Sequence, residues 1–310
     1  MTLQTIVLGL AWFTLVNAVA SLLSWLLASW FRSSAEQVDR TRRLALVRMF
    51  PACVSILFAL AIFLPSHLVL EPADANESLG LLWYSLAGCG TVLLGRAAVR
   101  ALTLWRAGRE LLSDSHRSAM ITAGVHQVEG IPGVSLAGVF KPRVLIGPEA
   151  ARELTSAELD VAIAHELAHR DAGDNVTRAS MMCAPDFFGG SRRARHLETT
   201  WHEAAESLAD ARAVDGDRVR ALHLASALVK VARLSASATA RPQPAWSTLN
   251  DPSLLERRVR RLVSGALTPA VQGNRGIAWA LLTALGLIAA VPLFAGSLHR
   301  LTEYLVRLLP

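Results

Sequence analysis

The chain has 310 residues, of which 52% are hydrophobic and only 18% are charged. Soluble domains average about 45–50% apolar and about 25% charged residues, so this composition excludes a disordered or fibrous chain and argues against an ordinary soluble enzyme. The formal net charge is +6. Because nearly all basic residues are arginines in short clusters beside apolar runs, we expect no direct nucleic-acid binding.

Four long apolar runs divide the chain, and a helix that crosses a bilayer needs about 20 mostly apolar residues. The predicted transmembrane helices cover about 5–30, 49–70, 79–105 and 276–298. The third contains Arg96 and Arg100, whose charges we expect to reach the membrane surface or to face other helices. The first has no basic residues before it and exceeds a signal-peptide core, so we interpret it as a retained span.

The arginines outside the spans predict the topology. The loop after the first span is rich in arginine, whereas the loop after the second has three acidic residues and no basic ones. By the positive-inside rule, the first and third connections face the cytoplasm and both termini lie outside. The sequence therefore predicts a multi-pass protein of a bacterial-type inner membrane. Three spans occupy 1–105, a cytoplasmic domain covers 106–275, the fourth span covers 276–298, and a short tail covers 299–310.

An HExxH motif, HELAH, lies in the polar domain on a predicted helix. Thr155 and Glu158 form a capping box before an apolar run, and no Gly or Pro interrupts the segment up to the motif. His165 and His169 are one turn apart on one face, so both imidazoles can reach a single Zn²⁺. The adjacent Glu166 can then hold the metal-bound water and take its proton, which is the chemistry of a catalytic zinc site.

A catalytic zinc needs a third protein ligand, and the segment WHEAAESLADARAV supplies candidates. Glu206 and Asp210 are four residues apart on one helix face. Glu206 is the candidate third ligand, and Asp210 would accept a hydrogen bond from a ligand imidazole. Asp174 is a second candidate for orienting a histidine. His202 and Glu203 remain rival third ligands.

Residues 125–214 resemble the zinc domain of membrane-embedded gluzincin peptidases. The match rests on KPRVLIGPEAARELTSAELDVAIAHELAHRDAGDN, on WHEAAESLADARAV and, more weakly, on LLERRVRRL. Two families fit, the β-lactam-sensor antirepressor peptidases and the family of the heat-shock membrane protease and the CAAX prenyl-protein endopeptidase. The arrangement of spans is more similar to the first. The resemblance implies a polytopic α-helical membrane protein with a cytoplasmic α+β zincin (gluzincin) domain and one catalytic Zn²⁺.

The sequence departs from these families in two respects. The sensor enzymes often carry an extracellular penicillin-binding domain after the last span, and this sequence ends at Pro310, so β-lactam recognition is not expected. The residue that would stabilise the oxyanion of the transition state is also not identified by any spacing. The candidates are His223, Arg212, Arg218 and Arg220.

The stretch VSLAGVFKPRVLIG, before the motif, predicts a β-hairpin. In zincins of this type an extended substrate pairs with an edge strand, so that main-chain hydrogen bonds position the scissile carbonyl. Ala137, Gly138 and Val139 are the candidates for this role. The alternative is that they only pack within the sheet.

These patterns together predict an integral membrane zinc metalloendopeptidase that cleaves a protein or peptide. Regulatory cleavage of a cytoplasmic substrate such as a transcriptional repressor is the favoured role. Membrane-protein quality control is an alternative within proteolysis. A non-catalytic receptor or scaffold that retains the zinc fold is an alternative of another class, and the intact Glu166 argues against it because a scaffold needs no water-activating carboxylate.

Overall fold

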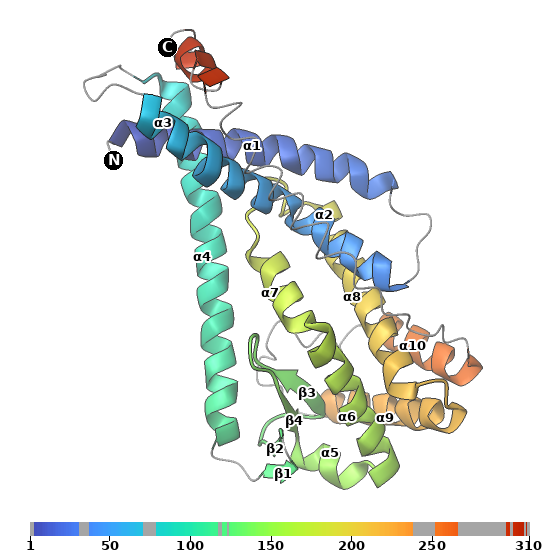
Figure 1. Cartoon of the computed structure of the whole chain (residues 1–310). Helices are drawn as coiled ribbons and strands as arrows, with labels where there is room; N and C mark the ends of the chain where they lie inside the picture. Colours follow the sequence, from blue (N-terminus) through green and yellow to red (C-terminus); the bar gives the residue numbers. More distant parts are fainter. Residues whose placement is uncertain are drawn as a thin grey trace.

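The computed structural model describes residues 3–30, 37–70, 79–116, 120–122, 124–237, 252–265, 296–297, 300–306 and 308. These residues form a mostly helical molecule with one small sheet (Figure 1). Four elements precede the sheet: α1 (Leu3–Trp30), α2 (Gln37–Leu57) with its continuation through the π-helix Phe58–Phe63, α3 (Leu64–Leu70) and α4 (Leu81–His116).

Three helical runs are long and apolar enough to cross a membrane, and they match the first three predicted spans. Their bounds are Leu3–Leu26, Arg40–Val69 and Leu81–Glu110. The length and composition of these three helices are therefore consistent with a membrane location. The predicted fourth span, 276–298, lies outside the described residues except for 296–297.

The arginine-rich segment after the first span differs from the prediction, which made it a loop. Helix α2 begins at Gln37 and carries Arg40, Arg42 and Arg43 in its first turns. Arginine, leucine and alanine are good helix formers, and no glycine or proline interrupts the helix before Pro51. The arginines mark the edge of the apolar run, but they lie inside helix α2 and not beyond its end.

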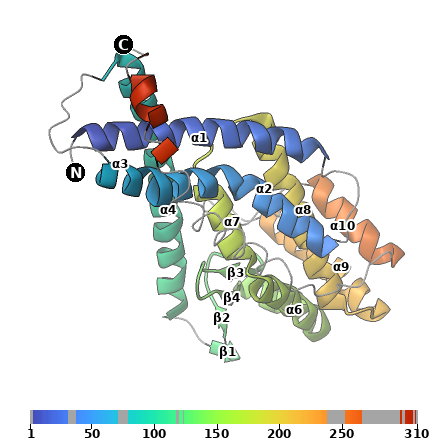
Figure 2. The same ribbon diagram turned by 45° about the horizontal axis from the view of Figure 1, so that its top comes forward.

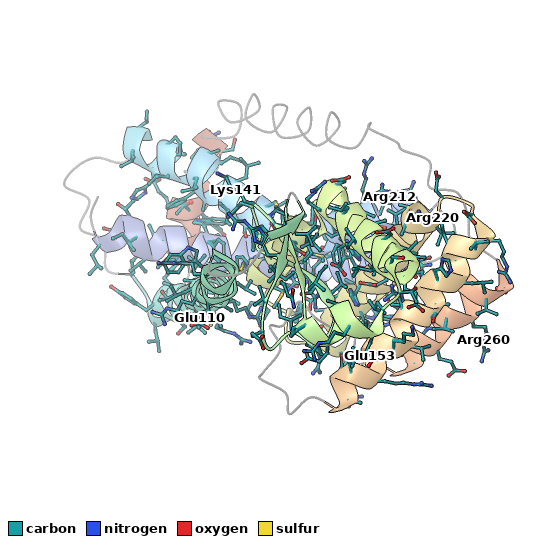
Figure 3. All side chains as sticks on the ribbon, turned by 90° about the horizontal axis from the view of Figure 1, so that it is seen from below. Glu110, Lys141, Glu153, Arg212, Arg220 and Arg260 are labelled. Atoms are coloured by element: carbon teal, nitrogen blue, oxygen red, sulfur yellow. The ribbon has the colours of Figure 1, made fainter. Side chains whose placement is uncertain are left out.

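The candidate spans do not form a parallel bundle. Helix α4 runs steeply across α1 and α2 (Figures 1 and 2). In Figure 3, α4 is seen end-on while α1 runs across the picture. At the crossing, the Thr14 hydroxyl donates to the Leu86 carbonyl over 2.9 Å. A Cβ on Gly90 would lie 2.6 Å from the Thr14 hydroxyl oxygen, so only glycine permits this close approach of α1 and α4.

The sheet has the strand order β1 (Met120–Thr122), β2 (Val125–Gln127), β4 (Arg143–Ile146), β3 (Val134–Ala137). Strands β3 and β4 pair antiparallel, with Leu136 opposite Val144, which confirms the predicted hairpin and places β3 at an edge. Alternate side chains of this hairpin, such as Val134 and Ile146, are buried against the helical layer. Sheet and helices thus share one core.

Further helices follow the sheet, and one of them carries the HExxH motif. They are α5 (Pro148–Glu153), α6 (Ser156–Ala172), α7 (Asp174–Cys183), α8 (Arg192–Val214), α9 (Arg218–Ser237) and α10 (Pro252–Ser264). Val161, Val214 and Leu262 belong to one buried cluster that joins α6, α8, α9 and α10. A second cluster packs Ala45 of α2 against Trp201 of α8. Helix α8 therefore contacts both α6, which carries the HExxH motif, and a candidate span.

Candidate metal centre

Helix α6 presents both histidines of the motif. Its N-terminus is fixed by the predicted capping box: the Glu158 amide donates to the Thr155 hydroxyl over 3.3 Å, and the Thr155 amide donates to the Glu158 carboxylate over 2.8 Å. The helix ends at Ala172 and is followed by Gly173, whose φ of 70° suits glycine. His165 and His169 are four residues apart and so share one face of α6, and that face meets Glu206 of α8.

Three donor groups converge between α6 and α8. The Nε2 atoms of His165 and His169 are 3.1 Å apart. The two carboxylate oxygens of Glu206 each lie 3.5 Å from one of these nitrogens. Each of the three residues offers a ligand atom within 4.8 Å of the other two, which makes them a candidate metal site. Two imidazole nitrogens and one carboxylate oxygen are the donor set of many catalytic zinc sites.

Both imidazoles are held from behind by carboxylates. His169 Nδ1 lies 2.6 Å from Asp174 Oδ2, and His165 Nδ1 lies 3.1 Å from Asp210 Oδ1. A carboxylate at Nδ1 favours the tautomer that carries the proton there, which leaves the Nε2 lone pair directed at the common centre. The two aspartates therefore occupy the positions that orient metal-binding histidines, and this donor chemistry fits Zn²⁺.

Arg258 of α10 supplies a positive charge next to the carboxylates of Asp210 and Glu206. Its Nε and Nη2 donate to the two oxygens of Asp210 over 2.9 and 2.6 Å, and its Nη1 lies 2.7 Å from Glu206 Oε2. Only 2% of Arg258 is exposed. A buried carboxylate needs such a partner to stay ionised, so one guanidinium serves both acids.

The pKa values follow from this arrangement. Burial favours the protonated form of Asp210 and Glu206, but the Arg258 charge and the contacts with the histidines together outweigh it, lowering the pKa of Asp210 to about 2 and that of Glu206 well below its ordinary range. Burial raises the pKa of Glu166, and the two histidines only partly oppose this shift. Glu206 is thus set up as an anionic ligand and Glu166 as a stronger base than an exposed glutamate.

The rival third ligands lie differently. Glu203 is half-exposed and forms an ion pair with Arg257 over 2.7 Å, on another face of α8. His202 lines the pocket, with Nδ1 3.8 Å from Glu206 Oε1, but it is not part of the converging group. The geometry therefore favours Glu206.

A pocket opens at the three donors. Its walls come from β3, α6, α7 and α8, and its lining includes Glu166, Asn175, Arg178 and His202. The sequence candidates for oxyanion stabilisation, His223, Arg212, Arg218 and Arg220, are not among its lining residues. Arg218 and Arg220 instead donate to backbone carbonyls of Leu262 and Ala213. Arg178 was missed by the sequence reasoning, although it lies one turn after Asp174 on α7.

The candidate substrate strand is also placed by the structure. Ala137 ends β3, whereas Gly138 and Val139 follow it and line a neighbouring pocket beside α7. The Asn175 amide donates to the carbonyls of Gly138 over 2.7 Å and Leu136 over 3.3 Å. The strand residues that line the metal pocket are Val134, Ser135 and Leu136.

Comparison with known proteins does not assign this site to a family. No family model matches the chain, and no match was found among the curated proteins or the solved structures. The interpretation of the site therefore depends on its own residues and geometry.

Proposed function

We propose that the protein is an integral membrane zinc-dependent metalloendopeptidase with its metal centre on the cytoplasmic side. The observation that carries the proposal is the convergence of His165, His169 and Glu206 in a pocket that also contains Glu166. When bound by these three residues, Zn²⁺ would lower the pKa of a coordinated water and polarise the peptide carbonyl.

Each residue of the chain has a distinct role in this reaction. Glu166 lies beside both histidines, and its raised pKa suits a group that takes a proton from water and passes it to the leaving amine. Asp174 and Asp210 hold the two imidazoles in the orientation that metal binding requires. Arg258 keeps Glu206 ionised.

The edge strand β3 offers a way to hold an extended peptide. The Gly147 amide donates to the Gly133 carbonyl, so the alternation of an antiparallel pair turns the backbone groups of Val134 and Leu136 towards the edge, where the Leu136 carbonyl already accepts from Asn175 and the groups of Val134 and the Leu136 amide remain for a peptide. A peptide paired there would lie along the metal pocket. Arg178 and His202, in the same pocket, are the polar side chains available to stabilise a developing oxyanion.

The substrate that we propose is a cytoplasmic regulator such as a transcriptional repressor, as the resemblance to the antirepressor peptidases implies. Membrane-protein quality control uses the same chemistry on other substrates. Proteomics of membranes and cytosol from cells with wild type or Glu166→Gln separates them. Stabilisation of one soluble regulator supports the first role, and accumulation of many membrane proteins supports the second.

The chemistry is tested with purified full-length protein, by metal analysis and cleavage of a peptide library. We expect Glu166→Gln to keep zinc and to lose activity by about 10²–10⁴-fold, because it removes the general base. Glu206→Gln should lose zinc as well. Glu203→Gln is the matched control on the same helix and should keep both properties. Wild-type cleavage by zinc-loaded Glu166→Gln would contradict the mechanism.

A further inference from the structure

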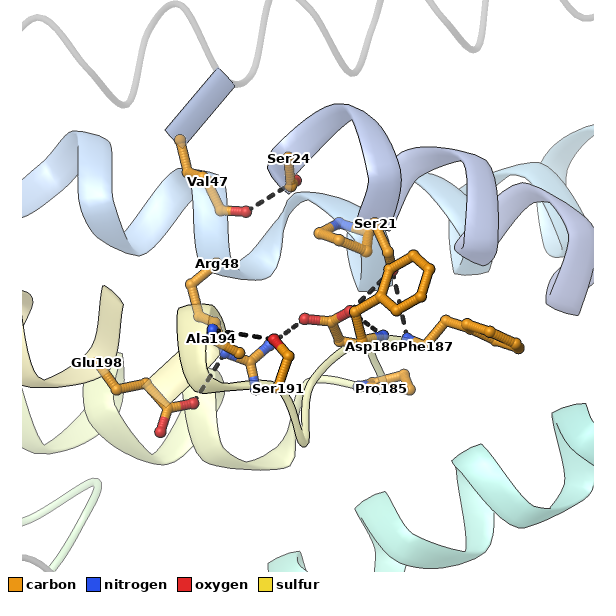
Figure 4. A network of polar contacts seen from close by, with 12 residues as sticks. Ser21, Ser24, Val47, Arg48, Pro185, Asp186, Phe187, Ser191, Ala194 and Glu198 are labelled. Carbon is orange, nitrogen blue, oxygen red and sulfur yellow. Dashed lines mark hydrogen bonds and ion pairs between the residues drawn. The ribbon is translucent and has the colours of Figure 1, made fainter. Parts of the chain in front are cut away.

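The connection between α7 and α8 is docked on helix α1 by polar side chains (Figure 4). Asn17 donates to the Pro185 carbonyl over 3.0 Å and accepts from the Phe187 amide over 2.9 Å. The Ser21 hydroxyl donates to the Asp186 carboxylate over 2.8 Å. Asn17 is fully buried, so these contacts form an interior interface between a candidate span and a segment far along the chain.

The position of Asn17 places this contact deep in the span. Asn17 lies within the candidate span Leu3–Leu26, away from both of its ends. Trp25, two turns further on, has the Arg193 guanidinium 4.0 Å above its ring, and Trp–Arg pairs of this kind suit the membrane interface. At a helical rise of about 1.5 Å per residue, Asn17 is about 12 Å from Trp25 along α1. The connection thus reaches further along the span than the start of α8 does.

Non-helical backbone can lie at membrane depth only where its polar groups are paired within the protein. The amides of Phe187, Phe188, Gly189 and Ser191 in the turn meet this condition. The Phe188 amide donates to the Asp186 side chain over 2.9 Å, the Gly189 amide to the Asp186 carbonyl over 3.0 Å, and the Ser191 amide to the Phe188 carbonyl over 2.8 Å. The Asp186 carboxylate also lies 3.4 Å from the guanidinium of buried Arg48.

The two phenylalanine side chains of the turn are exposed at the surface of the protein. Phe187 and Phe188 are 44% and 40% exposed and pack edge to face, with ring centroids 5.3 Å apart. On α1, Val19 and Leu22 are also exposed apolar residues close to Asn17 in sequence. Exposed apolar side chains at the depth of a candidate span are expected to contact acyl chains, and this expectation applies to Phe187 and Phe188 as it does to Val19 and Leu22.

We propose that the α7–α8 connection is a re-entrant element whose Phe187 and Phe188 contact the hydrocarbon of the bilayer. It anchors α8, the helix that carries Glu206, to the membrane from within. The predicted domain 106–275 is therefore not wholly cytoplasmic. This inference rests on the contacts with α1 and is independent of the proposed peptidase activity.

Spin labels test the depth of the turn in the full chain. Cys53, Cys89 and Cys183 are first replaced by serine, and the protein is placed in phosphatidylethanolamine–phosphatidylglycerol vesicles. A nitroxide is attached at Phe188→Cys, at Leu22→Cys as the lipid reference, or at Phe140→Cys as the water reference, since Phe140 is 86% exposed in the β3–β4 turn. Collision rates with oxygen and with a water-soluble nickel chelate are then measured.

We expect the ratio of oxygen to nickel collisions at position 188 to match that at position 22 and to exceed that at position 140. A ratio equal to that at position 140 would overturn the proposal. Low collision rates with both reagents would also overturn it, because they would show that protein, such as a second copy of the chain, covers the turn.

A second variant tests the anchor itself. Asn17→Leu removes the contacts with Pro185 and Phe187, and we expect it to shift the label at position 188 towards nickel accessibility. Thr14→Val is the matched control, because Thr14 is also buried on α1 but bonds Leu86 of α4. An unchanged ratio in Asn17→Leu, or an equal shift in Thr14→Val, would contradict the role of Asn17.

Discussion

Arg258 beneath the metal centre and Arg48 beneath the α7–α8 connection each bridge two carboxylates, and each is only 2% exposed. Arg258 contacts Asp210 and Glu206 at 2.6–2.9 Å, and these acids have side chains only 2% and 11% exposed. Arg48 contacts Asp186 at 3.4 Å and Glu198 at 2.8 Å, with side chains 10% and 34% exposed.

The difference between the Arg258 and Arg48 clusters indicates a separate role for each. Around Arg258, the charges are almost completely removed from water, and Asp210 is held in a bidentate geometry, which costs stability and suits a site that must keep anionic groups in place. Around Arg48, one longer contact, to Asp186, and two more exposed acids join α2 to the α7–α8 connection and to α8. The first cluster fixes two carboxylates beside the candidate metal site, and the second joins separate elements of the fold.

The largest effect is expected at the metal centre. Arg258→Met leaves Glu206 and Asp210 buried without their cation, and we expect the free energy of unfolding to fall by about 3–5 kcal/mol. Arg258→Lys should recover only part of this loss, because an ammonium cannot form the bidentate pair with Asp210. Thermal unfolding of the metal-free protein in detergent measures both changes. If the free energy of unfolding fell no further than in an exposed variant such as Arg260→Met, the proposed difference between the Arg258 and Arg48 clusters would be contradicted.

Glu158 extends the comparison to a third buried carboxylate. Burial raises its pKa, but bonds from Lys230, Ser226 and Thr155 outweigh burial and lower the pKa from 4.5 to about 2. Since the folded pKa is depressed, this stabilisation is fully present above pH 4.5 and is lost as the pH falls towards 2. We expect Glu158→Gln to cost about 1–3 kcal/mol at neutral pH.

The pH dependence provides the check on Glu158. Stability measured by denaturant titration should fall less steeply between pH 4.5 and 2 in Glu158→Gln than in the wild type. Identical slopes in the two proteins would show that Glu158 does not contribute to acid sensitivity.

A smaller effect is expected at Arg48. Its acidic partners can recover some hydration, so Arg48→Met should cost about 1–2 kcal/mol, less than Arg258→Met. The loss should appear as faster proteolysis near the α7–α8 connection rather than as loss of bound zinc. An effect as large as that of Arg258→Met, with zinc released, would show that the two clusters are not separate in function.

Local patterns in the sequence predicted much of the site. The capping box and the HExxH spacing fix His165, Glu166 and His169 within one helix, and the four-residue spacing places Glu206 and Asp210 on one face of another. Uncharged runs likewise predicted three helices long enough to span a membrane. Each of these features depends on contacts within a single element.

The remaining features depend on contacts between distant elements. Arg258 lies 48 residues from Asp210 in sequence, among several arginines of α10 that look alike until packing buries only this one. Asn17 and Pro185 are 168 residues apart, and neither residue carries a signal for the other. The start of α2 was missed because arginines next to an apolar run indicate a membrane boundary but are also good helix formers.

Zinc K-edge X-ray absorption on the purified full-length protein tests the metal centre most directly. We predict a coordination shell of nitrogen and oxygen only, with two imidazoles at about 2.0–2.1 Å and a carboxylate oxygen at about 2.0–2.2 Å. This signature should disappear in Glu206→Gln and persist in Glu203→Gln. A sulfur ligand at about 2.3 Å, or a protein that binds no zinc, would contradict the assignment of His165, His169 and Glu206.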